Sequence, residues 1–319
     1  MNLTWGFYNR NMNLPSLEKY TSNFILRGIN VPLKRIKNNP KGLLKELPEV
    51  DNLKTGWPWD DQVNPEIYSY KKQWPKLTIV TPSFNQGQYI EETIRSVLLQ
   101  NYPNLEYIII DGCSTDNTKE ILEKYSPWIS YWQSEKDNGQ SNAINLGFSL
   151  ATGNYYGWIN SDDYYLKNVF HLVSESFLKS KSNFIYGYGY SYDENLNQYN
   201  LIKTAPFFDL LIRIPSLLQP SCFWSSSIHQ PTWEELSCAL DYELWLRLVK
   251  GNKRRLIKEP LAVARIHEQA KSYNLSFEKK WEKDHLLICG NDAHGSVPTW
   301  KYLIFLNRIY RRILLLINY

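Results

Sequence analysis

The sequence has few cysteines and only a small excess of positive charge. Its four cysteines, Cys113, Cys222, Cys238 and Cys289, stand far apart, with neither a CxxC pair nor the paired spacing of a zinc site. We therefore expect free thiols in a reducing compartment and no disulfide framework. The 36 basic and 32 acidic residues leave a formal charge of +4, which is far from the concentrated basic surface of a dedicated nucleic-acid binder.

Long hydrophobic runs are also missing. The longest apolar run of the C-terminal tail is ILLLI, and the N-terminal MNLTWGFYNRNMN lacks the basic-then-apolar order of a signal peptide. We expect a cytoplasmic protein, with peripheral contact to the inner face of the cell membrane left open. Apolar residues nevertheless make up 43% of the 319 residues and aromatic residues 15%, which is enough for one large domain with appendages.

Strand and helix patterns alternate from Leu77 onward. The β-branched run LTIVTPS precedes the amphipathic YIEETIRSVLLQ, and LEYIIIDG precedes STDNTKEILEKY, where Ser114 or Thr115 is placed to cap the helix. ISYWQSE and GQSNAINLGFSLATG form a third round, and YYGWIN a fourth strand. This order predicts an α/β fold with right-handed crossovers and a parallel sheet covered on both faces.

Polar residues follow all four predicted strands, in TPSFN, DGCSTD, SEKDNGQS and NSDD. Ligands bind beyond the carboxyl ends of strands in such sheets, so we expect a site there. The loop after the first strand, PSFNQG, is neither GxGxxG nor GxxxxGK[ST]. Its sequence argues against a dinucleotide oxidoreductase and against a P-loop NTPase.

The adjacent acids of WINSDDYYL, residues 158–166, allow two interpretations. In the first, Ser161 or Asp162 caps a helix whose dipole favours acids at its N-terminus. In the second, Asp162 and Asp163 hold a divalent cation and a diphosphate, because hard cations prefer oxygen ligands and bridge carboxylates to phosphates. Asp111, at the end of YIIID, is placed to hydrogen-bond a base or a ribose.

Four ordered segments give the chain a specific resemblance. IVTPSFNQGQYIEETIRSVLLQ, YIIIDGCSTDNT, EKDNGQSNAINLGFSLATG and WINSDDYYL resemble consecutive signature segments of the family 2 glycosyltransferases of GT-A fold, of the bacterial cell-surface polysaccharide type. The resemblance extends over roughly residues 57 to 270. It implies a Rossmann-like, mostly parallel sheet flanked by helices. It also implies inverting sugar transfer from a nucleoside-diphosphate donor to an acceptor hydroxyl, usually with Mn²⁺ or Mg²⁺. UDP is the carrier it favours, with GDP and dTDP as alternatives.

The resemblance assigns candidate residues to the donor site. The nucleotide and donor positions are Pro82, Ser83, Asn85, Asp111, Asp116, Gln140, Asn160 and Asp163, and the metal positions are Asp162, Asp163 and His267. Asn160 replaces the first acid of the family's DxD motif. Asp162 is therefore the preferred ligand, Asp163 assists or orients, and a strict need for metal does not follow. Arg265 and Lys271 are candidate cations for neutralising the diphosphate.

Asp241 is the candidate catalytic base. It opens the helix of SCALDYELWLRLVKG, where the family usually has Glu-Asp and this chain has Leu240 before Asp241. The resemblance implies that Asp241 accepts the proton of the acceptor hydroxyl, a contribution on the order of 10²–10⁴ in rate. The alternative is a helix cap. Gln219, in LLQPSCFW, resembles a position that borders the acceptor pocket.

Composition and pattern divide the chain into three parts. Residues 1–75 are predicted to form an extension packed on the core, because they lack a sustained period and are rich in aromatic residues. Residues 76–275 are the predicted catalytic domain, with a nucleotide-binding half (76–165) and an acceptor half (166–275). Residues 276–319 form a helical tail.

The end of that tail is amphipathic. One side of its predicted helix carries Leu303, Leu306, Tyr310, Ile313 and Ile317, and the other Lys301, Arg308, Arg311 and Arg312. Such a helix suits an anionic membrane interface. We hypothesise that residues 300–319 bring the protein to a lipid-linked acceptor; packing on the domain or on another subunit is the alternative.

Two further functions compete with sugar transfer to a glycan or lipid-linked glycan. A sugar nucleotidylyltransferase normally begins with a glycine-rich basic loop, and TPSFNQGQY is neither glycine-rich nor basic. A non-catalytic nucleotide- or glycan-binding homologue is favoured by Asn160 and Leu240, which depart from two motif positions. The sequence identifies neither the donor sugar, the linkage nor the oligomeric state.

Overall fold

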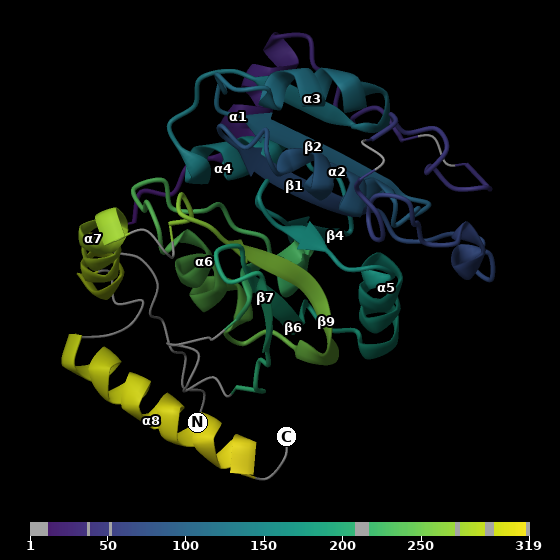
Figure 1. Ribbon diagram of the computed structural model, residues 1–319. Coiled ribbons are helices and arrows are strands. Elements are labelled where there is room, and N and C mark those ends of the chain that lie inside the picture. Colours follow the sequence, from purple (N-terminus) through teal and green to yellow (C-terminus); the bar gives the residue numbers. More distant parts are fainter. Residues whose placement is uncertain are drawn as a thin grey trace.

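A computed structural model describes residues 12–36, 39–50, 53–207, 217–271, 275–290 and 297–316. Within these ranges the centre of the protein is a nine-stranded sheet in the order β3-β2-β1-β4-β8-β6-β9-β5, with β7 paired to β6 (Figure 1). Helices lie on both sides of this sheet, as the alternating pattern predicts.

The first half of the sheet is parallel and contains the four predicted strands. These are β1 (Leu77–Ser83), β2 (Leu105–Asp111), β3 (Tyr131–Ser134) and β4 (Tyr155–Trp158). The α/β prediction is confirmed here.

The second half of the sheet is mixed. It contains β5 (Tyr164–Tyr165), β6 (Phe184–Asp193), β7 (Gln198–Ile202), β8 (Cys222–Ser225) and β9 (Arg254–Ile266). Strand β6 is parallel to β9 and antiparallel to β7 and β8. The turn between β6 and β7 spans only residues 194–197, a length that permits an antiparallel pair but not a parallel crossover.

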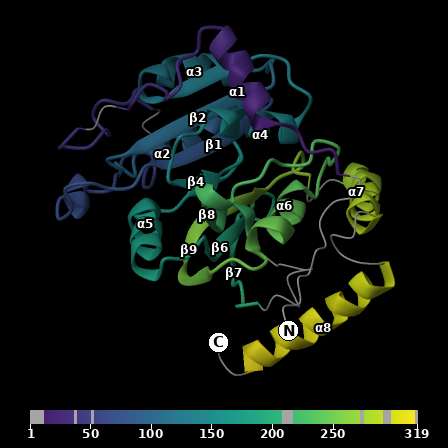
Figure 2. The same ribbon diagram turned by 180° about the vertical axis from the view of Figure 1, so that it is seen from behind.

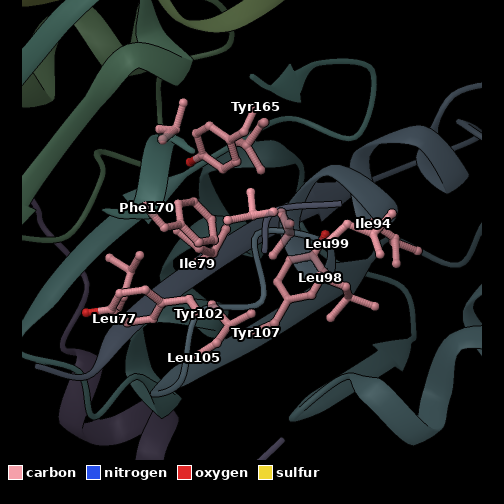
Figure 3. Packing of buried hydrophobic residues seen from close by; sticks show 14 of the residues in the cluster. Leu77, Ile79, Ile94, Leu98, Leu99, Tyr102, Leu105, Tyr107, Tyr165 and Phe170 are labelled. Atoms are coloured by element: carbon pink, nitrogen blue, oxygen red, sulfur yellow. The ribbon is translucent and has the colours of Figure 1, made fainter. Parts of the chain in front are cut away.

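Two apolar clusters fill the space between sheet and helices. One face packs against α2 (Ile90–Leu98), α3 (Thr118–Tyr125) and α5 (Val169–Ser180), and the other against α4 (Gln140–Leu150) and α6 (Leu240–Val249). Successive residues of β2 alternate between the two clusters, because side chains of a strand point to opposite faces. Figure 3 shows part of the first cluster, including Ile79, Leu98 and Phe170.

The described parts of residues 12–75 pack on this core. Helix α1 (Leu17–Leu26) places Phe24 edge-on to Tyr131, with ring centroids 5.7 Å apart. The buried guanidinium of Arg95 in α2 donates to Trp59 O at 2.7 Å and to Pro58 O at 3.0 Å. The N-terminal segment is thus fixed to the domain by apolar contacts and by hydrogen bonds.

Two helices end the chain, α7 (Glu278–Gly290) and α8 (Val297–Leu316). Helix α8 lies at the periphery in both views (Figures 1 and 2). Leu303 is buried, and Tyr310 Oη donates to Pro206 O at 2.7 Å. Ile317 and the side chain of Arg311 lie outside the described residues. In the part of the chain that the structure describes, no helix is long and apolar enough to span a bilayer.

Two helix caps that the sequence allows do not form: the cap offered as one interpretation of the acid pair, and the expected cap of α3. Asp162 and Asp163 do not begin a helix, because Tyr164 and Tyr165 continue as β5 and pair with β9; α5 starts only at Val169. Neither Ser114 nor Thr115 caps α3, whose N-cap position is Asn117. The hydroxyl of Ser114 donates to Asp111 instead.

Candidate functional site

Parallel pairing brings the ends of the first four strands to one edge of the sheet. Ser83 of β1 is in register with Asp111 of β2, and Asp111 with Ser134 of β3. Trp158 ends β4 two residues before Asn160 and pairs with Val80 of β1. The polar segments that follow these strands in the sequence therefore share one edge, with α6 and the end of β9 delivering further residues to it.

Asp111 is fully buried and held by three donors. Its Oδ2 accepts from Ser114 N at 2.9 Å and from Ser134 Oγ at 2.7 Å, and Ser114 Oγ donates to Oδ1. These bonds fix the orientation of the carboxylate at the end of β2.

Asn85 and Asp116 connect the loops after β1 and β2. Asn85 has a φ of 52°, which asparagine tolerates better than most residues, and its Oδ1 accepts from Thr115 N at 2.8 Å. Asp116 accepts from Gly87 N at 2.8 Å and from Thr118 N at 3.0 Å. Burial alone raises the pKa of Asp116, but these hydrogen bonds outweigh it and the pKa is lowered. Both side chains thus shape the loop that follows β1.

Two polar atoms near this loop are buried and have no hydrogen-bond partner among the described residues, Ser83 Oγ and Gln86 Oε1. An unsatisfied buried group costs about 1–3 kcal/mol, so these two atoms are candidate hydrogen-bonding contacts for a bound ligand. Pro82, which precedes Ser83 in β1, offers no backbone donor. Sequence reasoning missed Gln86, although it lies in the same PSFNQG segment.

Gln140 begins α4 and takes part in a chain of hydrogen bonds. Its Nε2 donates to Asn160 Oδ1 at 2.9 Å, and its Oε1 accepts from Lys271 Nζ at 2.7 Å. Gly139 precedes it with a φ of 101°, a backbone conformation that suits glycine. Asn160 also accepts from Trp158 Nε1 at 2.9 Å. Asn160, which stands where the DxD motif has its first acid, is therefore part of a hydrogen-bond network that joins β4 to α4.

Asp137 lies close to this network, and the sequence analysis did not identify it as a candidate. Asp137 Oδ1 accepts from Gly139 N at 2.8 Å. Burial raises the pKa of Asp137; the Gly139 bond opposes this rise, and the charge of Asp111 adds to it. Asp137 could have been identified from its place in EKDNGQS, one of the polar segments that follow the predicted strands.

The two adjacent acids have different surroundings. Asp162 keeps a partly exposed side chain, and its Oδ2 lies 3.1 Å from Nε2 of the buried His267. Asp163 points inward and accepts from Arg265 N at 2.9 Å. Burial, followed by the charge of Asp162, raises the pKa of Asp163 well above its usual range. Asp162 is thus the acid better placed to meet a ligand.

Arg265 is matched by carboxylates of the protein itself. Its guanidinium pairs with Glu92 at 2.7 Å and with Glu194 at 3.1 Å, and lies over the ring of Tyr89 at 4.8 Å. Its Nε also donates to Asp162 O at 2.9 Å. Arg265 therefore braces the turn that carries the acid pair.

Asp241 lies in the first turn of α6 and is half-buried. The N-cap position is Ala239, so Asp241 is not the residue at that position. Burial raises the pKa of Asp241; backbone donors of Tyr242 and Asp241 and the charge of Lys271 oppose this rise. Burial lowers the pKa of Lys271, and the charge of Asp162 is among the contributions that oppose this. The ammonium therefore lies within electrostatic range of both Asp241 and Asp162.

The donor set around Asp162 fits a divalent cation that also binds phosphate. Asp162 and His267 supply an oxygen and a nitrogen, whereas the carboxylate of Asp163 is already engaged. No group of three or more His, Cys, Asp and Glu side chains suited to a metal occurs in the described ranges. Mg²⁺ is commonly held by one or two carboxylates plus substrate phosphates, which would complete such a site.

Gln219 lies against this edge from the second half of the sheet. Its Nε2 donates to Trp158 O at 2.8 Å, and its Oε1 is 3.5 Å from Asn160 Nδ2. The segment predicted to border the acceptor thus contacts the strand end that precedes the acid pair.

Residues 78–233 match the family described as Glycosyl transferase family 2. The putative teichuronic acid biosynthesis glycosyltransferase TuaG of Bacillus subtilis is 36% identical over 120 residues, which cover 37% of this chain and 47% of that protein. An uncharacterized glycosyltransferase of Rickettsia conorii is 30% identical over 219 residues, 63% of this chain and 35% of that protein. The chain spans between a third and a half of the length of these two relatives.

WfgD of Escherichia coli, named a UDP-Glc:alpha-D-GlcNAc-diphosphoundecaprenol beta-1,3-glucosyltransferase, is 29% identical over 190 residues, 55% of this chain and 70% of that protein. Among solved structures, residues 1–349 of S. aureus TarS superimpose with a TM-score of 0.53 at 21% identity, covering 68% of this chain and 65% of that one. At this identity the likeness concerns the fold, and it confirms the predicted GT-A architecture.

Proposed function

Since residues 78–233 form a family 2 glycosyltransferase domain, we propose that the protein transfers a sugar from a nucleoside diphosphate to a hydroxyl of a glycan or lipid-linked glycan, in bacterial surface polysaccharide synthesis. UDP is the proposed carrier. The relatives named for teichuronic acid synthesis and for glucosyl transfer to a diphosphoundecaprenol acceptor support this direction.

The observation that carries the proposal is that the candidate donor residues and the candidate base lie near each other on different elements. Ser83, Asp111 and Gln140 lie at the strand-end edge with Asp162. Asp241 belongs to a different element, α6. The charge of Lys271 acts on Asp241, and Lys271 Nζ donates a hydrogen bond to Gln140. A donor site and a base on separate elements allow a donor and an acceptor to meet between them.

In the proposed mechanism, Asp111 and the loop of Asn85 bind the nucleoside. Asp241 accepts the proton of the acceptor hydroxyl while its oxygen attacks the anomeric carbon, with inversion of configuration. Its raised pKa makes the ionised form of Asp241 a stronger base than an exposed aspartate. The ammonium of Lys271 lies where it can attract the diphosphate as negative charge develops on the leaving group.

Asp162 and His267 are the residues proposed to hold a divalent cation, Mn²⁺ or Mg²⁺. Bound there, the ion would stabilise charge on the departing diphosphate. Asp163 is proposed to orient the turn through its bond to Arg265 N.

We also propose that α8 binds an anionic membrane surface, through a stripe that shares only Ile313 with the predicted side. Leu303 and Tyr310 belong to the side that packs on the protein. The outward stripe consists of Tyr302, Phe305, Ile309, Ile313 and Leu316, with exposed fractions of 41–82%. Exposed Lys301, Arg308 and Arg312 accompany it, and this combination suits a helix lying in an anionic lipid interface.

A transfer assay tests the proposed activity. The protein is incubated with UDP-sugars, Mn²⁺ or Mg²⁺ and diphosphate-lipid acceptors that carry one sugar, and both UDP and the extended acceptor are quantified. Equal amounts of UDP and product are expected. Nucleotide binding without transfer across the acceptor panel would instead favour a non-catalytic binding protein.

A further inference from the structure

A carboxylate of α7 binds the backbone in front of α6. Asp284 is 1% exposed, and its Oδ2 accepts from the backbone N–H groups of Ser237 at 2.9 Å, Cys238 at 2.6 Å and Ala239 at 2.9 Å. Asp241 follows Ala239 by two residues. A single side-chain oxygen thus receives three successive donors next to the proposed base.

Asp284 satisfies the backbone N–H of Ala239, the residue at the N-cap position of α6, and those of the two residues before it. Helices leave their first N–H groups without intrahelical partners, and a side-chain oxygen normally satisfies one of them. Ala239 occupies the N-cap position and makes no side-chain cap bond. The negative charge of Asp284 also suits the positive end of the α6 dipole.

Helix α7, which carries Asp284, also contacts the segment that contains Lys271. Trp281, one turn before Asp284 on α7, donates from Nε1 to Lys271 O at 3.3 Å. Lys271 Nζ in turn donates to Ser237 O at 2.7 Å. Ile288 anchors α7 in the core cluster shared with α4 and α6, and Figure 1 shows α7 beside α6.

We propose that Asp284 is a positioning residue, which holds the first turn of α6 so that Asp241 faces the acceptor hydroxyl. This role rests on the proposed function, since it assigns Asp284 to the geometry of the base. It makes the C-terminal helix α7 part of the catalytic apparatus, although α7 lies outside the matched family region, residues 78–233.

The test compares Asp284→Ala and Asp284→Asn with the unmutated full-length protein. Asp284→Ala is expected to lower kcat about 10–100-fold, in line with the cost of a misplacement near 1 Å, and to leave KM for the nucleotide sugar within about twofold. Asp284→Asn retains a carbonyl oxygen and is expected to recover part of kcat. Hydrogen exchange of peptides covering residues 235–243 is expected to accelerate in Asp284→Ala.

Glu106→Ala is the matched control. Glu106 is also a buried carboxylate with several donors, Thr152 N and Thr78 Oγ1 at 2.7 Å each, but it lies near the start of β2, away from the catalytic edge. It is expected to lower the melting temperature without the selective loss of kcat.

Unchanged kcat and unchanged exchange in Asp284→Ala would overturn the positioning role, as would an equal loss of kcat in Glu106→Ala. If Asp284→Ala does not fold, Asp284→Leu takes its place, because leucine fills the space but accepts no hydrogen bond. Unmutated kcat and unmutated exchange at residues 235–243 in that variant would likewise overturn the role. If the unmutated protein has no transferase activity, the proposed function is wrong. The exchange measurement would still show whether Asp284 holds the backbone of residues 237–239.

Discussion

Asp162 and His267 are separated by 105 residues, yet Oδ2 of the first lies 3.1 Å from Nε2 of the second. The contact arises because β9 pairs with β5, which follows the acid pair directly. The ring of Tyr89 packs against His267 with a centroid distance of 4.8 Å and limits the ring's movement. The two atoms proposed to hold a metal ion are thereby kept side by side.

Replacing Asp162 is expected to remove the metal-dependent part of nucleotide binding. A ligand at about one hundred times its dissociation constant stabilises the folded state by about 2.7 kcal/mol. UDP with Mn²⁺ should therefore raise the melting temperature of the unmutated protein by several degrees, and Asp162→Asn should abolish the additional shift that Mn²⁺ gives.

Asp61→Asn is the control for that measurement, because Asp61 is a partly exposed acid paired with Lys167 on the surface. It should keep the full metal-dependent shift. The same shift in Asp162→Asn as in the unmutated protein would remove Asp162 from the metal site.

Asp163→Asn is expected to stabilise the protein at neutral pH. Because burial raises its pKa, the folded protein holds a proton on Asp163 at pH values where the unfolded chain has released it. The contribution of Asp163 to stability therefore falls as pH rises from the unfolded pKa near 3.9 to the raised folded value. Asparagine avoids this loss and can still accept from Arg265 N.

Melting temperatures from pH 3.5 to pH 8 test this expectation. The advantage of Asp163→Asn should be present at pH 7 and disappear as pH falls toward about 4. A lower melting temperature for the variant at pH 7 would show that ionised Asp163 stabilises the fold.

The parallel half of the fold was predictable because each strand is followed by an amphipathic helix and a polar segment. LTIVTPS and LEYIIIDG became β1 and β2 at those positions. The structure of the chain after the fourth strand was harder to predict. The choice between a cap and a strand after Asp163 depends on pairing of Tyr164 with Val263, which local sequence does not encode.

Residues of the candidate site could be proposed from the sequence where a motif contains them, but not where only distant contacts bring them to the site. Asp111, Gln140, Asp162 and Asp241 were named from their segments. The role proposed for Asp284 comes from contacts with a turn about 45 residues earlier in the chain. Nothing in EKKWEKDHLLICG distinguishes this acid from its exposed neighbours; only its burial and its three backbone donors do so.

Asp241→Asn is expected to lower the transfer rate by a factor on the order of 10²–10⁴, because the amide cannot accept the proton. Its similar shape should leave nucleotide binding intact. Steady-state rates and nucleotide titrations on the same preparation would measure both effects. Transfer at the unmutated rate would remove Asp241 as the base.

Charged substitutions in the α8 stripe are expected to weaken membrane binding. Phe305→Asp and Ile309→Asp should each reduce co-sedimentation with vesicles containing anionic lipid, and high salt should weaken binding of the unmutated protein because it screens Lys301, Arg308 and Arg312. Leu196→Asp, on the exposed β6–β7 turn, is the matched control. Vesicle binding that neither α8 variant reduces would contradict the role of α8.

The most direct test of sugar transfer is the anomeric configuration of the product. The protein and Asp241→Asn would be incubated with an α-linked UDP-sugar and a lipid-linked acceptor, and the new linkage determined by NMR. We expect a β-linked product and one UDP per linkage from the unmutated protein, and a strongly reduced yield from the variant. An α-linked product would contradict inversion by Asp241, and pyrophosphate release from a sugar phosphate and a nucleoside triphosphate, without any transfer, would contradict the transferase itself.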